Sequence, residues 1–498
     1  MKRGLFIFPD SNFWIRAMLK LKKNKYIPEM IIGDISHKKF FKNVKIFNPD
    51  TFRLANSQKL FKSDKVVDGN IYDLLDESIF CSNICLTRFL PSKNHISSDE
   101  RDIYFFKAIN MILSLIKNNK FDFVVFASPP HRVTDQILFD ICKMKKIQII
   151  FYNHTLFDKY DFVSDKANLF IDSNNNFNKN ISGFLSEAIK NISEGKSYKF
   201  SYSVTSPNAS LKIKNRNILE NFIRNLRLKT TRKMMYDFNN LKKGKDSSFI
   251  GYFFFKYYEI LTKFKVLIAK DYYKKISVNL NLNDKYLYFP LAYQPEASTC
   301  PSGGYFSYNL FSIAYLINII PDDYKIYCKI HPRQFRNPID RDNFCDQAYL
   351  KALNDYSNRI KFLNFNTDSI NIIKNSRGLI TDASASTSFI EAMSLSKKVL
   401  SLNKNAYFRY FDNVLDLRKK NINKILVAKF LKDKFNYEKF LQNMSELERL
   451  THDFSSYRIS QQKIRHFVDF ENENETKDKK IFTNFVDQIL RNLNKNND

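Results

Sequence analysis

Three short polar stretches between residues 291 and 393 carry the side chains best suited to bind a phosphorylated ligand. The first, LAYQPEASTCPSGGYF, contains the adjacent pair Gly303 and Gly304 and a single carboxylate, Glu296. Glycine lets the backbone approach a ligand closely, and a helix that starts after glycines offers free N–H groups to an anion. We therefore expect Gly303 and Gly304 to bind phosphate and Glu296 to face the reacting group. A solvated loop acid or a helix cap is the alternative for Glu296.

The second stretch, YCKIHPRQF, places His331, one of only seven histidines, directly before Pro332 and Arg333. Proline lacks the N–H that a β-ladder requires, so a strand entering this stretch must end there. The imidazole can donate to a phosphate, a sugar or a base, and the guanidinium adds a permanent positive charge. The stretch predicts ligand binding by His331, Pro332 and Arg333. A histidine that only caps the strand end is the alternative.

The third stretch, TDASASTSFIEAM, gathers hydroxyl groups at the start of a predicted helix; they belong to Ser384, Ser386, Thr387 and Ser388. Ordinary helix capping needs one such residue. Four within five positions, together with the free N–H groups of the first turn, predict a phosphate cradle. Glu391 lies one turn further on, where we expect it to accept hydrogen bonds from ribose hydroxyls.

Each of these stretches follows a predicted β-strand, so the position of each stretch depends on the arrangement of the strands in the sheet. From residue 286 onward, short apolar runs alternate with helical patterns; the runs are YLYFP (286–290), YKIYCKI (324–330), IKFL (360–363), GLIT (378–381) and KVLSL (398–402). Between the first two, apolar residues from Phe306 to Ile320 recur every three or four positions and predict a helix that Pro321 ends. Strands alternating with helices predict a parallel sheet, and its ligands lie beyond the carboxyl ends of the strands. We therefore expect the three stretches to meet at one edge.

The N-terminal part shows the same alternation. Its predicted strands are GLFIF (4–8), EMIIGD (29–34), NVKIF (43–47), FDFVVFA (121–127) and IQIIFY (147–152). Between the last two, VTDQILFDICKMKK has apolar residues at helical spacing, so the order strand, helix, strand predicts a parallel βαβ unit.

A chain of 498 residues exceeds the usual size of a single core. The sequence predicts an α/β protein with two doubly wound, Rossmann-like domains that face a cleft. The expected divisions are an N-terminal domain (1–173), a mainly helical connector or insertion (174–284), a C-terminal domain (285–465) and a helical tail (466–498). This is the architecture of GT-B glycosyltransferases and of nucleotide-sugar epimerases.

The composition of the chain limits the classes of binding partner that we expect. The net charge of +29 would attract nucleic acid, an anionic membrane face or an acidic polymer. The excess is spread along the chain, without an Arg-Gly repeat or a zinc-finger spacing, which argues against nucleic acid. The longest apolar runs fall far short of the roughly 20 residues of a membrane-spanning helix. We expect a cytoplasmic protein whose basic, aromatic-rich connector helices either pack on the domains or lie at the inner membrane face.

The cysteine and acidic patterns point away from metals and disulfides. The six cysteines form no C-x-x-C pair, and no His/Cys cluster has metal-binding spacing. No acidic pair with D-x-D spacing follows a clear predicted strand. We therefore expect no metal and no other cofactor, with the charge of a leaving group met by His331, Arg333 and the helix dipole.

Taken in order, YFPLAYQPEASTCPSGGYF, YCKIHPRQF and TDASASTSFIEA resemble the capsule and surface-polysaccharide biosynthesis proteins of bacteria, which are GT-B glycosyltransferases related to capsular Kdo transferases. The His-Pro and serine-rich motifs are also similar to those of bacterial sialyltransferases. The resemblance extends more weakly to residues 128–162. It implies that His331, Pro332 and Ser384 to Ser388 hold the nucleotide of a CMP-linked donor, while Glu296 and His131 flank the reacting sugar.

The expected function is therefore metal-independent transfer of a sugar, such as Kdo or another ulosonic acid, to a glycan or glycolipid acceptor. The catalytic base is one of Glu296, His131 and Asp10, since a carboxylate or histidine in the cleft must deprotonate the acceptor hydroxyl. Asp10 follows the first predicted strand, where a simple turn is the alternative. Three other functions remain open: a glycerophosphotransferase that uses CDP-glycerol, a nucleotide-sugar epimerase, and a non-catalytic assembly protein of the same fold.

Overall fold

The computed structural model describes most of two α/β domains. The described residues are 1–9, 12–33, 40–49, 52, 98–130, 132–154, 160–164, 189–194, 249–294, 299, 303–335, 346–383, 386–403, 408, 411–450, 452–453 and 476–494. Within the predicted connector (174–284), residues 174–188 and 195–248 lie outside these ranges.

The first domain is built on a mainly parallel sheet in the order β14-β6-β5-β4-β1-β2-β3. Its strands are β1 (Lys2–Ile7), β2 (Tyr26–Ile32), β3 (Lys45–Phe47), β4 (Phe123–Phe126), β5 (Gln148–His154), β6 (Tyr160–Ser164) and β14 (His452–Asp453). The β1 to β5 strands pair in parallel, whereas β6 and β14 run antiparallel at one side. Alternate residues of β1 enter different cores, because successive side chains of a strand point to opposite faces. Leu5 and Ile7 join one cluster and Phe6 joins the other.

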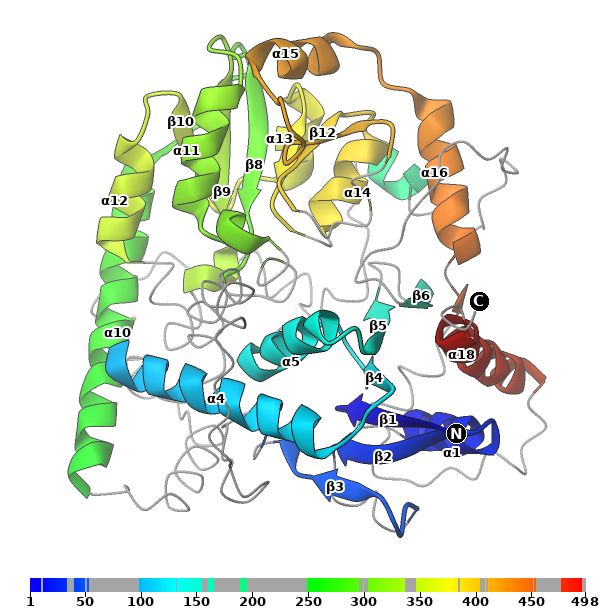
Figure 1. Ribbon diagram of the computed structural model, residues 1–498. Coiled ribbons are helices and arrows are strands. Elements are labelled where there is room, and N and C mark those ends of the chain that lie inside the picture. Colours follow the sequence, from blue (N-terminus) through cyan, green and yellow to red (C-terminus); the bar gives the residue numbers. More distant parts are fainter. Residues whose placement is uncertain are drawn as a thin grey trace.

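Helices cover both faces of this sheet (Figure 1). On one face lie α4 (Ser98–Asn118) and α5 (Val133–Met144), and on the other lie α1 (Asn12–Lys23) and α18 (Thr476–Asn494). The C-terminal helix α18 therefore belongs to the first domain. Its Phe485 packs against Trp14 of α1 with ring centroids 5.0 Å apart, and Gln148 of β5 donates to the Asn492 carbonyl at 2.6 Å.

The second domain has a parallel sheet in the order β13-β12-β11-β8-β9-β10-β7. Its strands are β7 (Ser277–Val278), β8 (Tyr286–Leu291), β9 (Lys325–Ile330), β10 (Ile360–Leu363), β11 (Leu379–Thr381), β12 (Val399–Ser401) and β13 (Val414–Asp416). Every described pairing in it is parallel. The chain builds the sheet outward from β8 to β10, then returns to the other side of β8 with β11. In such doubly wound sheets the point of reversal, here between β8 and β11, is where ligands bind.

Helices cover this sheet on both faces as well. One face carries α10 (Phe249–Ile276), α11 (Asn309–Ile319), α12 (Gln347–Asp355) and α15 (Lys424–Lys432), and the other carries α13 (Ser369–Asn375), α14 (Thr387–Ser394) and α16 (Tyr437–Leu450). Two short 3-10 helices, η5 (Gly304–Ser307) and η6 (Pro332–Phe335), follow β8 and β9. The resulting three-layer domain places the loops after β8, β9 and β11 at one edge.

The apolar runs that predicted strands form strands in both domains, and the α/β fold with two Rossmann-like sheets is confirmed. The helix predicted from Phe306 begins later, at Asn309, because the positive φ of 55° at Gly304 introduces a separate turn first. The described part of the connector is mainly helical, ends with strand β7 and joins the second domain. There the buried Tyr273 hydroxyl of α10 donates to the Leu363 carbonyl of β10 at 2.6 Å.

In the part of the chain that the structure describes, no helix combines the length and the apolar character that crossing a bilayer would require.

Candidate functional site

The carboxyl edge of the second sheet carries polar side chains after three neighbouring strands. Gln294 follows β8, His331 follows β9 and Asp382 follows β11. The β8 and β11 strands are adjacent and lie on either side of the point where the strand order reverses. Residues after these two strands therefore stand where a doubly wound sheet binds its ligand.

The glycine pair in the first predicted stretch forms a tight turn. Gly304 has a φ of 55°, in the left-handed region that side chains with a Cβ rarely adopt. Gly303 donates its N–H to the Thr299 carbonyl at 2.6 Å, and a Cβ added to Gly303 would lie 2.6 Å from that same oxygen. Both positions thus require glycine for backbone reasons. Binding of phosphate at this turn stays a prediction.

His331 lies at the end of β9, where the His-Pro pair ends the strand as predicted. Its imidazole is exposed, and its ring centroid lies 5.5 Å from that of Tyr293. Pro332 begins η6, whose start is fixed by the Gln334 N–H donating to the His331 carbonyl at 2.9 Å. The side chain of Arg333 lies outside the part that the structure describes. The exposed imidazole is accessible to a ligand from the loop edge.

The serine-rich stretch begins α14. Ser386 occupies the N-cap position but makes no side-chain hydrogen bond to the first turn of the helix. Thr387 and Ser388 follow it and are half-buried, whereas Ser384 lies outside the described residues. The Ser386 hydroxyl is thus not used as a helix cap, which leaves the predicted cradle for an anion consistent with the local geometry.

Glu391, the predicted ribose ligand, stands on α14 near the buried Lys329 of β9. Lys329 donates to the Thr367 carbonyl at 2.9 Å and to the Ser369 hydroxyl. Burial lowers the pKa of Lys329 to about 8 against the opposing effect of Glu391 and Asp368. Burial likewise raises the pKa of Glu391 to about 7, with Lys329 opposing the shift. Burial therefore shifts Glu391 toward its neutral form, and its role toward ribose stays a prediction.

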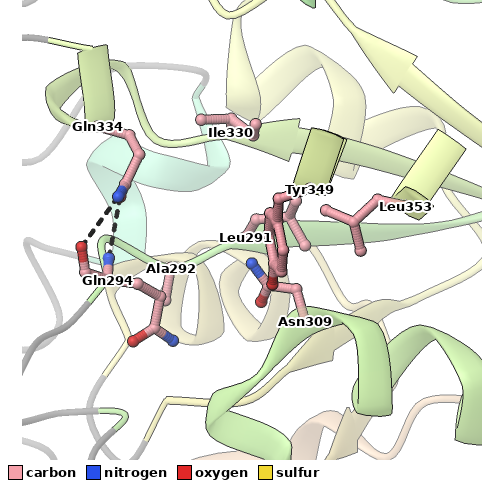
Figure 2. Close-up of a pocket in the computed structure, with 8 residues that line it drawn as sticks. All are labelled: Leu291, Ala292, Gln294, Asn309, Ile330, Gln334, Tyr349 and Leu353. Atoms are coloured by element: carbon pink, nitrogen blue, oxygen red, sulfur yellow. Dashed lines mark hydrogen bonds between the residues drawn. The ribbon is translucent and has the colours of Figure 1, made fainter. Parts of the chain in front are cut away.

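The loop after β8 is fixed by a network of glutamines that the sequence did not bring to attention (Figure 2). Gln294 donates its N–H to the side-chain oxygen of Gln334 at 3.0 Å, and Gln334 donates back to the Gln294 carbonyl at 2.9 Å. The Thr299 hydroxyl donates to the side-chain oxygen of Gln294 at 2.8 Å. These bonds tie the β8 loop to η6 and hold Gln294 in one orientation.

A small pocket lies beside this network. It is lined by Leu291, Ala292, Gln294, Asn309, Ile330, Gln334, Tyr349 and Leu353. Figure 2 shows Asn309 and Tyr349 beside each other, where α11 begins. The Tyr349 hydroxyl lies against the backbone N–H groups of Asn309 and Leu310. The first turn of α11 is thus directed into the pocket.

Buried polar atoms without a hydrogen-bonding partner occur at several places in the described chain, for example at the hydroxyls of Ser114 and Ser394. Four of them lie at this edge: the side-chain nitrogen of Gln294, the side-chain oxygen of Asn309 and both carboxyl oxygens of Asp382. The three side chains are 1%, 5% and 1% exposed. An unsatisfied buried polar group costs about 1–3 kcal/mol, so native structures rarely leave one without a reason. Because Gln294, Asn309 and Asp382 each have such an atom near the switch point of the sheet, this edge is a candidate site for a polar ligand.

Asp382 is part of this group because it lies near Tyr349. Burial, chiefly, raises the pKa of Tyr349, and the Asp382 carboxyl adds to the rise. Burial also raises the pKa of Asp382 itself to about 7. The sequence contained a signal for this residue, since Asp382 directly follows a predicted strand. The prediction for this stretch concerned its hydroxyl groups and did not include Asp382.

The predicted catalytic residues Asp10, His131 and Glu296 lie outside the described residues. The first domain does show a cation at the corresponding edge. The Arg132 guanidinium, at the N-cap of α5, lies 4.5 Å from the centroid of the Phe8 ring. Phe8 follows β1 and has a positive φ of 54°. Because β1 and β4 flank the reversal point of the first sheet, Arg132 stands where that domain would meet a ligand.

The strand orders and these loops define a class of protein: an α/β chain with two Rossmann-like sheets and a candidate ligand site at the switch point of the second. No family model and no curated protein matches the chain. Solved structures that match it include two epimerases and one glycosyltransferase, each at low identity.

The UDP-GlcNAc 2-epimerase of Methanocaldococcus jannaschii, in complex with UDP-GlcNAc and UDP, is 13% identical over 93% of this chain and 100% of its own, with a TM-score of 0.22. The UDP-GlcNAc 2-epimerase of Neisseria meningitidis, bound to UDP-GlcNAc, is 10% identical over 89% and 98%, with a TM-score of 0.23. A glycosyltransferase from Rickettsia africae is 11% identical over 94% and 99%, with a TM-score of 0.23. Scores this low support no conclusion, so the fold rests on the strand order of this chain alone.

Proposed function

We propose that this chain is a glycosyltransferase that uses a nucleotide-sugar donor and acts in the synthesis of a capsular or surface polysaccharide. In this proposal the second domain binds the nucleotide and the first domain presents a glycan or glycolipid acceptor. The observation that carries it is the group of buried side chains at the switch point that have polar atoms without a partner: Gln294, Asn309 and Asp382.

The physical reason is the free energy that these side chains forgo in the ligand-free protein. Each unsatisfied buried group costs about 1–3 kcal/mol, and a ligand rich in hydroxyl and amide groups can supply the missing partners. A nucleotide-sugar has such groups in its base, its ribose and its sugar. Its phosphates would meet the exposed His331 and the unused hydroxyl of Ser386 at the start of α14.

The finer assignments rest on the resemblance of three sequence stretches. They favour a CMP-linked donor, such as one carrying Kdo or another ulosonic acid. The net charge of +29 suits peripheral contact with the anionic inner face of the membrane, where a glycolipid acceptor would be found.

The chemistry is direct transfer at the anomeric carbon. Glu296, with His131 and Asp10 as the other candidates, removes the proton of the acceptor hydroxyl while the acceptor oxygen forms the new glycosidic bond. The bond from the sugar to the nucleotide breaks, and the nucleotide leaves with its bonding electron pair. His331 and the N-terminal turn of α14 stabilise the charge on the departing phosphate.

A panel of nucleotides tests the binding half of the proposal. We expect one of CMP, CDP and UDP to raise the melting temperature, because a ligand that binds only the folded state stabilises it by mass action. His331→Ala should then lower the affinity for that nucleotide in calorimetry. A chain that none of the three stabilises, or a variant with unchanged affinity, would contradict the site assignment.

Product analysis tests the transfer half. Glu296→Gln should keep nucleotide affinity and lose turnover, since the amide cannot accept a proton. Conversion of a nucleotide-sugar in the absence of any acceptor would instead identify an epimerase. Near wild-type transfer by Glu296→Gln would remove Glu296 from the mechanism.

A further inference from the structure

We propose that Asp382 determines which ligand the second domain accepts, and that its carboxyl group forms hydrogen bonds to an uncharged polar group of the ligand, a hydroxyl or an N–H. The inference rests on the proposed function, because it concerns the same site. It assigns to this residue a role in recognising the sugar or base rather than the phosphate.

The backbone at Asp382 is held firmly. Asn403, after β12, donates its side-chain N–H to the Asp382 carbonyl at 2.7 Å. The N–H of Ala383 donates to the Thr381 hydroxyl at 3.3 Å. The unpartnered carboxyl therefore does not belong to a loosely placed loop. Its position beyond β11 is fixed by the neighbouring strand end.

The side chain itself is buried and unsatisfied. Asp382 is 1% exposed, and neither carboxyl oxygen accepts a hydrogen bond from another residue. Asp284, which precedes β8 at the opposite edge, shows how the same domain treats an aspartate with a structural role. Its two oxygens accept from Lys325 at 2.7 Å and from the Tyr327 hydroxyl at 2.6 Å. The contrast indicates that the partner of Asp382 is supplied from outside the chain.

The surroundings of Asp382 define what that partner is. The Asp382 carboxyl is close enough to Tyr349 of α12 to contribute to the raised pKa of that hydroxyl, and Asn309, at the start of α11, also has an unpartnered side-chain oxygen. The Asn309 amide oxygen accepts hydrogen bonds, and the Asp382 carboxyl accepts them in both protonation states and donates one when it is neutral, so the ligand must bring donors. A phosphate brings acceptors and negative charge, which the carboxyl group repels once it ionises. The ligand group at Asp382 is therefore a hydroxyl or an N–H, and the phosphates lie elsewhere along the edge.

Calorimetry with matched nucleotides tests this inference on the full chain. The variants are Asp382→Asn, which keeps the shape, and Asp382→Ala, which removes the group. Ser394→Ala is the control, because it removes another buried, unpartnered oxygen at the far end of α14. The probes are CMP, 2′-deoxy-CMP, 3′-deoxy-CMP and UMP, which differ in one hydroxyl or in the amino group of the base.

We expect Asp382→Ala to weaken CMP binding about tenfold, which is the usual loss for one hydrogen bond to an ionisable group, and Ser394→Ala to leave it unchanged. One probe should bind the wild-type chain more weakly than CMP does, whereas that probe and CMP should bind Asp382→Ala with equal affinity, because the interaction that the probe lacks is already gone in this variant. A melting transition retained in Asp382→Asn shows that lost binding is not lost folding.

Each other outcome is decisive. If the affinity of every variant for CMP stays within twofold of that of the wild-type chain, Asp382 recognises no ligand group. The same conclusion follows if the substitutions lower the affinity for every probe equally. In both cases the proposed function stands. If the wild-type chain binds none of CMP, CDP and UDP, the proposed function fails, and the inference fails with it.

Discussion

Replacing Asp382 with asparagine should stabilise the ligand-free second domain, and the gain should grow with pH. Asparagine has the shape of the neutral carboxyl group but cannot ionise. In the folded chain, burial raises the pKa of Asp382 from 3.8 to about 7, so the folded state holds a proton that the unfolded state releases. Between these two pKa values the folded state binds more protons, and stability falls as the pH rises.

The magnitude follows from the same numbers. A pKa raised from 3.8 to about 7 corresponds to about 4 kcal/mol of unfolding free energy, present in full above pH 7. At pH 5 the same relation gives about 2 kcal/mol, and the difference vanishes below pH 4. The variant should therefore exceed the wild-type chain by about 4 kcal/mol at pH 8. Glu391 titrates in the same direction in both proteins, so the comparison isolates Asp382.

Hydrogen exchange is the suitable assay, because the single tryptophan, Trp14, lies in the core of the first domain and does not report on the second. Exchange of the β8, β11 and β12 amides, measured by mass spectrometry at several pH values, gives the opening free energy of the second domain. Equal protection in the two proteins at pH 8, or lower protection in the variant, would show that the carboxyl group has a partner in the ligand-free chain and would refute the reasoning.

Three further substitutions address the supports of the site. Arg359→Ala should destabilise the second domain by about 2–4 kcal/mol in the same exchange assay, because the Arg359 guanidinium donates to the Ile317 carbonyl in the last turn of α11 and to the carbonyls of Ile320, Pro321 and Tyr324 in the segment that leads to β9; unchanged α11 protection would contradict this. Gly303→Ala should weaken nucleotide binding with little effect on exchange in β10, since the new Cβ meets the Thr299 carbonyl and displaces the turn; unaltered affinity would exclude the turn from the site. Gln334→Leu removes two hydrogen bonds to Gln294, so it should cost about 1–3 kcal/mol and lower nucleotide affinity in calorimetry, and an unaffected affinity would show that the β8 loop needs no such support.

The sequence predicted the sheets well because their signals are local. Runs such as YKIYCKI form buried strands wherever a helix can cover them, and Pro332 ends β9 as its missing N–H requires. Some short strands escaped, among them Ser277–Val278 and Val414–Asp416, whereas the three-residue strands Leu379–Thr381 and Val399–Ser401 were predicted from the apolar runs GLIT and KVLSL.

The site was predicted only in part, for a physical reason. The sequence identified the loops that follow β8, β9 and β11, and Gly303 and Gly304 do form a turn that demands glycine. It did not single out Gln294, Gln334 or Asp382. Whether a polar side chain has a partner depends on residues 40 or more positions away, and only the folded chain brings these together.

Helix α18, which contains the last described residues of the chain, packs on the N-terminal domain, the part of the chain that is synthesised first. Phe485 lies against both Trp14 and Tyr152, and Asn492 donates to the Val163 carbonyl at 3.2 Å. The contacts of α18 with α1, β5 and β6 can therefore form only after more than 300 residues beyond β6 have been synthesised. The second domain contains its own strands and helices and can fold in the meantime. The first domain is thus synthesised first but completed last, and removal of α18 would destabilise the domain at the other end of the sequence.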